Sequence, residues 1–431
     1  MGLVLAASCT AELGSCQRSS SPDLSTLSAE QLQFWLGLPG QPSLFLEPVA
    51  EILASTGEGG NYGDIVRVHM ALDHAPLPSI IAKQIRPKAG LEVGDMLTLT
   101  EHSRFMQGFH VEAAAYKNLS KELLAADLAV PRVLHVEEVE LGEPFVILLE
   151  DLSLRFPRGA GAAVRHFHGA ETLAALRWLA GFHALFWEKP FAEQRGLWQQ
   201  GSYWILDKLG QLQLEALPAD FSNRYLTAQE TQRLRRAALA VDQRLAGKDP
   251  EHPGKTDSRF RTLVHGDAKP ENMLCSDGPA PRCAALDFGW VGEGYGVRDV
   301  AYLLWDQIAT NVVEDLLSEY HTMLLDRLPH PAKSAYTRTV LKQHFDLAVL
   351  DFIRVHASGT ATRLGARIQR RHVLLGDALG HPDPSHRARP TGRGCPALDS
   401  ALRESRGPRL PDLRPLQKES RFLPRLGRWI S

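Results

Sequence analysis

The sequence predicts an α+β fold with two lobes, in which a small β-rich lobe is followed by a larger and mainly helical one. Up to about residue 151, short runs rich in Val, Ile and Leu alternate with turn residues, and one long helical pattern interrupts them. Beyond residue 151 helical patterns predominate, and strand-like pieces return only within residues 262–289. The length of 431 residues also favours two or three packed lobes over a single small module.

The β-rich lobe is predicted to begin with a helix near Ser28, where Gln31 three residues later completes a capping box. A second helix is expected over residues 102–125, because apolar residues recur there three or four positions apart. Strand-like runs lie at residues 44–53, 64–72, 78–85, 132–140 and 144–151. These runs and the second helix form a five-stranded, one-helix unit.

The helical lobe is predicted to contain five long helices and three short strands. The helices cover residues 170–188, 227–246, 299–309, 312–328 and 334–357, and the strands cover 262–267, 272–275 and 283–289. The expected domain boundaries are a disordered tail at 1–27, the β-rich lobe at 28–151, the helical lobe at 152–381 and a tail at 382–431. This last tail has eight prolines and eleven Lys or Arg against five acids, so we expect it to be disordered.

Composition and charge exclude several classes of partner. The 48 Lys and Arg residues balance 50 Asp and Glu residues, and the net charge of −2 gives no field to attract nucleic acid. No stretch approaches the roughly 20 apolar residues that span a bilayer, so no membrane insertion is expected. Five sparse cysteines argue against a disulfide framework and for a cytoplasmic location, with Cys275 and Cys283 expected to be buried thiols. The oligomeric state is left open.

The most specific motif is the run from Val264 to Asn272, VHGDAKPEN, followed by LDFG at residues 286–289. Phosphoryl transfer from a nucleotide needs one carboxylate to orient the acceptor hydroxyl and oxygen ligands to hold magnesium against the phosphates. Asp267 and Asn272 lie five residues apart, and Asp287 follows fifteen residues later after an apolar strand. Each motif alone would pass for an ordinary turn, but both in order and at hairpin spacing favour the chemical interpretation.

The β-rich lobe should then supply a phosphate-binding loop and a lysine. Glycines at residues 57–63 lie between two strand-like runs, where backbone amides can approach phosphate oxygens; Gly60, Asn61 and Gly63 are the candidates, although a plain β-turn is an equal alternative. Lys83 ends the strand-like IIAK, which resembles the VAIK strand of kinases, and this resemblance implies that Lys83 contacts the α- and β-phosphates. Glu112, 29 residues later on the predicted helix, is the candidate to pair with Lys83; its alternative is a solvated glutamate.

With these motifs the sequence resembles the aminoglycoside phosphotransferase and choline-kinase-like superfamily, with the ecdysteroid-kinase-like branch closest. Further matching motifs are GNY at 60–62 with VRV at 66–68, LLEDL at 148–152, LAGFHALFW at 179–187 and GVRDVAYLL at 296–304. The resemblance covers about residues 43–375. It implies a protein-kinase-like fold, in which the segment with Glu150 and Leu152 is the hinge whose backbone meets adenine.

The resemblance further implies an ATP- and magnesium-dependent kinase for a small molecule that bears a hydroxyl group. Asp267 would accept the proton from the acceptor hydroxyl, and Asn272 and Asp287 would hold Mg²⁺. Asp299 is expected to tie its helix to the loop of Asp267. Only nine residues separate Gly289 from Asp299, which leaves no room for the peptide-docking segment of a protein kinase.

A catalytically silent nucleotide-binding module that acts through interactions is the alternative function. The intact Lys83, Asp267, Asn272 and Asp287 argue against it, whereas the irregular glycine loop and the unusual tail keep it open. His183 is interpreted as a hydrogen-bonded core histidine. The aromatic residues between 178 and 204 are interpreted as core more readily than as lining of an acceptor pocket.

Overall fold

The computed structural model describes residues 32, 35–36, 49–55, 62–69, 79–86, 96–138, 140–159, 166–167, 169–189, 195–206, 228–248, 259–307 and 312–359. The predicted tails at 1–27 and 382–431 lie outside these residues. Leu32 and Trp35 are helical, and the Leu36 amide donates a hydrogen bond to the Leu32 carbonyl at 2.9 Å, as expected for the first predicted helix.

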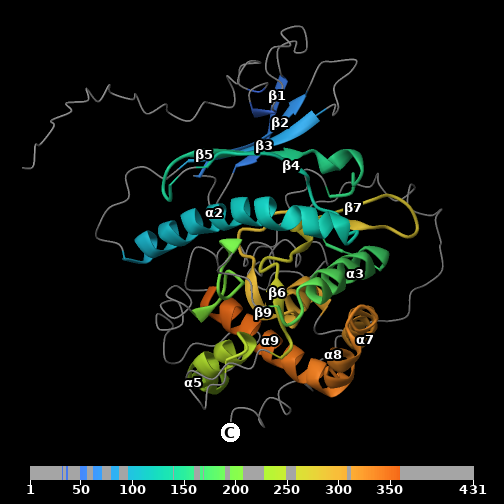
Figure 1. The fold of residues 1–431 in the computed structure, drawn as a ribbon. Coiled ribbons are helices and arrows are strands. Elements are labelled where there is room, and N and C mark those ends of the chain that lie inside the picture. Colours follow the sequence, from blue (N-terminus) through green and yellow to red (C-terminus); the bar gives the residue numbers. More distant parts are fainter. Residues whose placement is uncertain are drawn as a thin grey trace, which may run out of the picture. The chain divides into compact units, whose positions relative to one another are not determined.

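A five-stranded antiparallel sheet occupies the N-terminal part of the described chain (Figure 1). Its strands are β1 (Val49–Ser55), β2 (Asp64–His69), β3 (Ser79–Ile85), β4 (Val133–Val136) and β5 (Phe145–Glu150). Their order is β1-β2-β3-β5-β4, so β3 lies at the centre with Lys83 opposite Ile65 on one side and Ile147 on the other. All five strand-like runs of the sequence therefore contain strands. Each strand is shorter than its run, and β1 ends at Ser55, two residues beyond the predicted end.

The apolar pattern of the strands explains why this sheet forms. Every residue of β5 is buried, which suits a strand covered on both faces. Side chains from β2, β3 and β5 form one core cluster with the N-terminal helical turn, and its members are Leu32, Trp35, Val66, Val68, Ile80, Ala82, Val146 and Leu148. The central strand that carries Lys83 is thus fixed by packing from both of its neighbours.

Helix α2 (Met96–Ala125) begins six residues before the predicted start and contacts β4. The short 3₁₀ turn η3 (Leu152–Leu154) follows the sheet, and two long helices come later in the chain, α3 (Ala170–Leu185) and α5 (Ala228–Leu245). Helix α3 is buried along most of its length, because most of its own residues are small or apolar.

Two small antiparallel pairs carry the polar motifs. One pair is β6 (Arg261–Val264) with β9 (Gly292–Tyr295), and the other is β7 (Met273–Cys275) with β8 (Cys283–Ala285). A single 3₁₀ turn, η6 (Pro270–Asn272), joins β6 to β7. Helix α3 contacts three of these strands, β6, β7 and β8. Strand β9 is an addition that the sequence pattern missed, because Gly292-Glu293-Gly294-Tyr295 lacks an apolar run.

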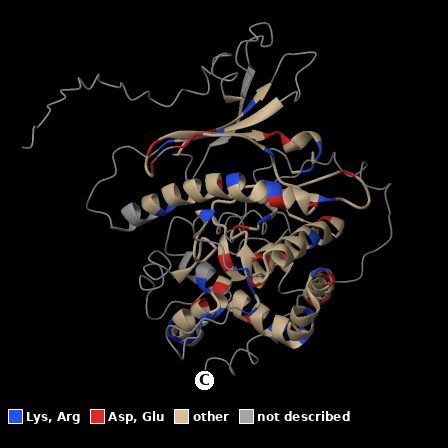
Figure 2. Cartoon of the chain, in the orientation of Figure 1, with Lys and Arg blue, Asp and Glu red and all other residues tan. Residues whose placement is uncertain are grey.

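The remaining helices are α6 (Val297–Leu303), η7 (Trp305–Gln307), α7 (Val312–Leu325), α8 (His330–Ala335) and α9 (Arg338–Gly359). The single helix predicted over 334–357 is wrong at its start, since α8 ends at Ala335 and α9 begins at Arg338. Among the described residues, none of the helices is both long enough and apolar enough to cross a membrane. Figure 2 colours Lys and Arg blue and Asp and Glu red, and both colours occur along the described helices.

By contacts the chain divides into two compact units. The first comprises residues 1–212 and 239–352, and the second comprises residues 213–238 and 353–431. The described part of the second unit consists of helical residues 228–238 and 353–359. The α+β class is confirmed, whereas the boundary between lobes near residue 151 falls inside the first unit and stays a prediction.

Two half-buried histidines in the N-terminal region are expected to make the folding stability of the protein fall at acidic pH. His110 in α2 and His135 in β4 each have a buried Nε2 with no hydrogen-bond partner, and burial lowers the pKa of both imidazoles below the ordinary value. As the pH falls, these two imidazoles take up protons in the unfolded chain before they do so in the folded protein. The contribution of the two neutral imidazoles to stability is therefore present above about pH 6.5 and is lost as the pH falls through the lowered pKa values.

We therefore expect the melting temperature to fall between about pH 7.5 and about pH 5.5, and the fall to be smaller in a His110→Gln/His135→Gln double variant. The exposed His330 in α8 supplies the control variant His330→Gln, which should melt like the parent at each pH. An identical pH dependence in the double variant and the parent would contradict this assignment. The measurement is thermal denaturation followed by circular dichroism.

Candidate functional site

Asp267 lies on the loop between β6 and η6 and is 4% exposed. Its Oδ2 accepts hydrogen bonds from Lys269 Nζ at 2.7 Å and from Asn272 Nδ2 at 2.8 Å. Its Oδ1 is also buried but has no hydrogen-bond partner within the structure. Because an unpaired buried carboxylate oxygen is costly, this atom marks a place where a donor from outside the chain fits.

Asp299 in the first turn of α6 holds this loop in place through hydrogen bonds to its backbone. Its side chain is fully buried and accepts hydrogen bonds from the backbone amides of His265 at 2.6 Å and Gly266 at 2.9 Å. It also lies 3.1 Å from Nε2 of His183, whose Nδ1 is 2.8 Å from the Tyr320 hydroxyl. As expected, Asp299 ties α6 to the loop, and His183 is a hydrogen-bonded core histidine.

Glycines allow the segments around Asp267 to pack at backbone contact. Gly266 has φ +81°, and a Cβ there would lie 2.1 Å from the Trp290 carbonyl oxygen. A Cβ on Gly292 would lie 2.3 Å from the Trp198 carbonyl oxygen. Ser202, which has φ +92°, donates its amide to the Trp290 carbonyl at 3.0 Å. The loop of Asp267 is therefore held between two segments that are distant in sequence.

Lys83 connects the central strand of the sheet with α2 and with the second acidic motif. Its Nζ lies 2.5 Å from Glu112 Oε2 and 3.5 Å from Asp287 Oδ1. Burial alone would lower the pKa of Lys83, but the carboxylates of Asp287 and Glu112 outweigh it and raise that pKa. The lysine is thus held as a cation between two carboxylates, and the predicted pairing of Lys83 with Glu112 is present.

The two acidic motifs place their carboxylates in opposite electrostatic settings. Burial raises the pKa of Asp267, and Lys269 only partly opposes this. Burial acts on Asp287 in the same direction, but Lys83 and Lys269 outweigh it, so the pKa of Asp287 is lowered. Two nearby carboxylates whose pKa values are pushed apart are typical of a site that gives them different roles.

Asn272 and Asp287 are the candidate metal ligands, and the local chain geometry brings them near each other. Asn272 precedes β7 directly, and its backbone carbonyl accepts a hydrogen bond from Leu286, the neighbour of Asp287, at 2.8 Å. The Asn272 amide nitrogen is bound to Asp267, which leaves its amide oxygen as the ligand atom. Asp287 has φ +62° and a side chain that is 44% exposed.

This donor set fits Mg²⁺, which prefers oxygen ligands and is usually held by one or two side chains together with phosphate oxygens. Across the described ranges, no group of three or more His, Cys, Asp or Glu residues is arranged to hold a metal ion without such additional ligands.

The glycine-rich loop is described only at its end. Gly60 and Asn61 lie outside the described residues. Gly63 has φ +123°, and a Cβ there would lie 2.0 Å from the Gln84 carbonyl oxygen, so close contact with β3 requires glycine at this position. The structure thus gives Gly63 a packing reason, and its predicted contact with phosphate stays a prediction.

The predicted hinge residues, Glu150 and Leu152, have side chains that are engaged within the protein. The Glu150 carboxylate is bound by Arg132 at 3.2 Å and by Arg155 at 3.0 Å. Leu152 is buried in a cluster with Ala129, Phe156, Leu274 and Ala284. Only backbone groups of these two residues could meet adenine, which is the form in which the resemblance implied their role.

Lys269, Tyr203 and Tyr302 belong to the site but were not assigned by sequence reasoning. Lys269 contacts Asp267 directly, and its position two residues after this aspartate was the signal that could have identified it. The Tyr203 amide donates to the Gly266 carbonyl at 3.4 Å, and its hydroxyl lies 3.5 Å from that of Tyr302. Burial, reinforced by the charge of Asp267, raises the pKa of Tyr203 to about 12.

Aromatic residues of the middle region divide between core and site. Trp178, Trp187 and Trp204 are buried, as expected for core positions. Trp198 instead stacks on Trp290 with a centroid distance of 5.7 Å. Trp198 and Tyr203 are both partly buried, and the backbone amide of Tyr203 binds the loop of Asp267 through the Gly266 carbonyl.

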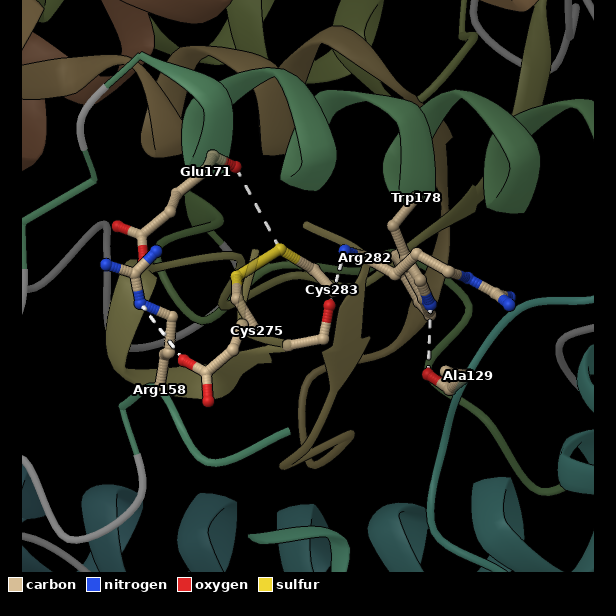
Figure 3. Close-up of a disulfide and its surroundings, with 9 residues drawn as sticks. Ala129, Arg158, Glu171, Trp178, Cys275, Arg282 and Cys283 are labelled. Carbon is tan, nitrogen blue, oxygen red and sulfur yellow. Dashed lines mark hydrogen bonds and ion pairs between the residues drawn. A yellow bond between two sulfur atoms is a disulfide. The ribbon is translucent and has the colours of Figure 1, made fainter. Parts of the chain in front are cut away.

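Cys275 and Cys283 form a disulfide, so the expectation of buried free thiols is wrong (Figure 3). The two residues lie directly opposite each other in the β7–β8 hairpin, with Cα atoms 4.2 Å apart. The backbone N–H and C=O of Cys275 bond to Arg158 and not to Cys283. Cys275 and Cys283 therefore form a non-hydrogen-bonded antiparallel pair, the type in which the two Cα atoms lie closer together. The sequence separation of eight residues did not reveal this register.

Reduction of this disulfide is expected to destabilise the protein by about 2.5 kcal/mol, since it closes a short loop of the unfolded chain. Urea unfolding with and without a phosphine reductant measures the difference. A Cys275→Ala/Cys283→Ala variant is the control and should not respond to the reductant. Equal unfolding midpoints for the oxidised and the reduced parent would show that the bond contributes nothing.

Comparison with known proteins gives one family and several distant structures. The APH family, described as "Phosphotransferase enzyme family", matches residues 95–335, more than half of the chain. No curated protein matches the chain.

Three solved structures illustrate the distant similarity. An aminoglycoside-3'-phosphotransferase of type VIII is 16% identical, with 70% of this chain and 95% of that chain covered at a TM-score of 0.40. A microcompartment-associated aminopropanol kinase is 14% identical, with 73% and 92% covered at a TM-score of 0.41. A Plasmodium vivax ethanolamine kinase is 8% identical, with 76% and 79% covered at a TM-score of 0.43. At TM-scores below 0.5, these similarities do not indicate an acceptor.

Proposed function

The chain belongs to the APH phosphotransferase enzyme family, and from this premise we propose that it transfers the γ-phosphate of ATP to a hydroxyl group of a small metabolite. The observation that carries the proposal is the convergence of Lys83 on both Glu112 and Asp287. Lys83 belongs to the sheet and Asp287 to the second acidic motif. One cation therefore joins the two parts of the protein that a nucleoside triphosphate must contact.

Asp267 is the proposed catalytic residue. Its free Oδ1 accepts a hydrogen bond from the acceptor hydroxyl, while Lys269 and Asn272 hold Oδ2 and fix the carboxylate plane. Burial raises the pKa of Asp267, which makes this carboxylate a better proton acceptor. Lys269 also places a positive charge beside the path of the transferred phosphoryl group.

Lys83 is proposed to contact the α- and β-phosphates, oriented by Glu112. Asn272 and Asp287 are proposed to hold Mg²⁺ through the amide oxygen and the ionised carboxylate. When bound, the ion neutralises charge on the phosphate oxygens. Gly60, Asn61 and Gly63 are proposed to approach the phosphates, and the backbone at Glu150 and Leu152 to meet adenine.

The narrower assignment to the ecdysteroid-kinase-like branch is also part of the proposal. It is supported by the helix that contains His183 and by the α6 sequence that contains Asp299. The cytoplasmic location expected from the sparse cysteines stays a proposal, and the Cys275–Cys283 disulfide argues against it, since such bonds are rare in reducing compartments.

A screen of metabolite extracts for transfer of labelled γ-phosphate tests the function. We expect a labelled small-molecule product that requires magnesium and the intact Asp267. ATP-dependent thermal stabilisation without any transfer across extracts and defined alcohols would overturn the proposed kinase and favour a silent nucleotide-binding module.

The metal assignment predicts that magnesium-ATP stabilises the parent protein and that Asp287→Asn loses most of this effect. At a ligand concentration about 100 times the dissociation constant, the stabilisation is about 2.7 kcal/mol. Asp277→Asn is the matched control, because Asp277 lies in the same hairpin with a side chain that is 77% exposed. Melting curves with and without magnesium-ATP decide: an undiminished shift in Asp287→Asn contradicts the assignment.

A further inference from the structure

A pocket of about 460 Å³ lies at the proposed hinge. Of its lining residues, only Glu150 is assigned a contact in the proposed transfer reaction, and that contact is made by its backbone. It is lined by Leu124 at the end of α2, Arg132 before β4, Glu150 and Asp151 after β5, and Leu154 and Arg155 in the following turn. Its volume is in the range of pockets that hold one small organic ligand.

The positive charge in this pocket exceeds what its carboxylates neutralise. Arg132 and Arg155 share the single carboxylate of Glu150, at 3.2 and 3.0 Å. The other carboxylate, Asp151, is already bound by Arg67 at 2.7 Å, by the Ser79 hydroxyl and by Ser153. Two guanidinium groups against one carboxylate leave one positive charge uncompensated.

Both arginines have donors to spare. Arg132 uses its Nε on Glu150, and Arg155 uses one Nη2 donor, although each guanidinium carries five N–H groups. Their side chains are 57% and 53% exposed, and the Arg155 guanidinium lies 5.4 Å from the centre of the Phe156 ring. Planar guanidinium groups with spare donors are suited to a carboxylate or a phosphate.

The rest of the pocket includes two leucine side chains that are exposed to solvent. Leu154 is 57% exposed and Leu124 is 36% exposed, and both are among the few large hydrophobic side chains of the described chain that face solvent. Exposed leucines beside charged donors are typical of a site whose ligand has an apolar body.

We propose that this pocket, defined by Leu124, Arg132, Leu154 and Arg155, binds a small amphipathic anion, with a carboxylate or phosphate on the arginines and an apolar chain or ring on the leucines. The proposal commits to a soluble small molecule, because the volume of about 460 Å³ is in the range of pockets that hold one such ligand. Apart from the Glu150 backbone, no residue of the pocket is assigned a contact with the nucleotide or the acceptor, and occupation is measurable without nucleotide.

Octyl phosphate below its micelle concentration is the probe, and calorimetric titration of the full chain is the measurement. We expect octyl phosphate to bind at least about 10-fold more tightly than inorganic phosphate or octyl glucoside, because only octyl phosphate has both the charge and the apolar chain. The proposal is overturned if octyl phosphate does not bind, or if inorganic phosphate or octyl glucoside binds as tightly as octyl phosphate. Preference for vesicles with anionic lipid over octyl phosphate also overturns it, in favour of a membrane surface.

Substitutions in and near the pocket test whether octyl phosphate binds there. Arg132→Gln/Arg155→Gln should weaken octyl phosphate binding by about 10-fold or more, whereas Arg158→Gln, which removes a 48% exposed arginine outside the pocket, should not. Because the double variant leaves Glu150 without its two guanidinium partners, Leu154→Asp is a second variant that keeps both arginines and places a negative charge beside the ligand. Parent-like binding in Leu154→Asp, or in a folded double variant, contradicts the site.

Discussion

Replacement of Asp267 by Asn is expected to lower acceptor phosphorylation by about 10²- to 10⁴-fold while nucleotide affinity changes by only a few-fold. Asn keeps the size of the side chain and can still accept from Lys269, but it cannot take a proton from the acceptor hydroxyl. In barrier terms this loss corresponds to about 3–5.5 kcal/mol. Nucleotide contacts are assigned to Lys83 and Asp287, so they should persist.

The acceptor found in the extract screen supplies the assay, in which kcat and the nucleotide dissociation constant are measured separately. Asp326→Asn is the control, since the Asp326 side chain is 67% exposed at the end of α7 and far from the loop in sequence. A variant Asp267→Asn that turns over like the parent would falsify the assignment of Asp267 as proton acceptor. Loss of nucleotide binding in the variant would instead show that Asp267 contributes to the nucleotide site.

Asp299→Ala is expected to lower the free energy of unfolding by about 3–5 kcal/mol, because it removes the buried partner of several donors at once. The amides of His265 and Gly266 and the imidazole of His183 would all lose their acceptor. Such a loss is a large share of the about 5–15 kcal/mol that typically stabilises a folded domain.

Urea unfolding at neutral pH measures the effect, and Asp315→Ala provides the comparison, since Asp315 is an exposed residue in the first turn of α7. The control should stay within about 0.5 kcal/mol of the parent. Asp299→Ala should lose both stability and turnover, whereas Asp267→Asn should lose turnover alone. A parent-like unfolding curve for Asp299→Ala would mean that the loop is held by other contacts.

The fold was predictable where apolar periodicity was strong. The five strands follow from runs of Val, Ile and Leu that must be buried, and the sheet contains all five. The long helix α2 follows from apolar residues three or four positions apart. Strand β9 was missed because its glycine-rich sequence has no such run; it forms because β6 offers it an antiparallel partner. The break between α8 and α9 was missed because it falls at Tyr336 and Thr337, where the sequence has no Gly or Pro to mark it.

The site was predictable where spacing within a motif sets geometry. Asp267 and Asn272 are five residues apart and meet through a single hydrogen-bonded turn. Lys83 and Asp287 are 204 residues apart, and only the family resemblance indicated that they would meet. The disulfide and the contribution of Tyr203 required the register of a hairpin and the path of a distant segment, which no single motif encodes.

The glycine contacts around Asp267 bear on how a new acceptor specificity could arise or be engineered. Gly266 and Gly292 have no space for a side chain, so the backbone that carries Asp267 is a fixed platform. Diversity must then enter through the side chains that face this platform, of which Tyr203 and Tyr302 are two. A mutant library aimed at other alcohols is best concentrated on these tyrosines, with the glycines kept constant, so that reaction geometry and substrate choice vary separately.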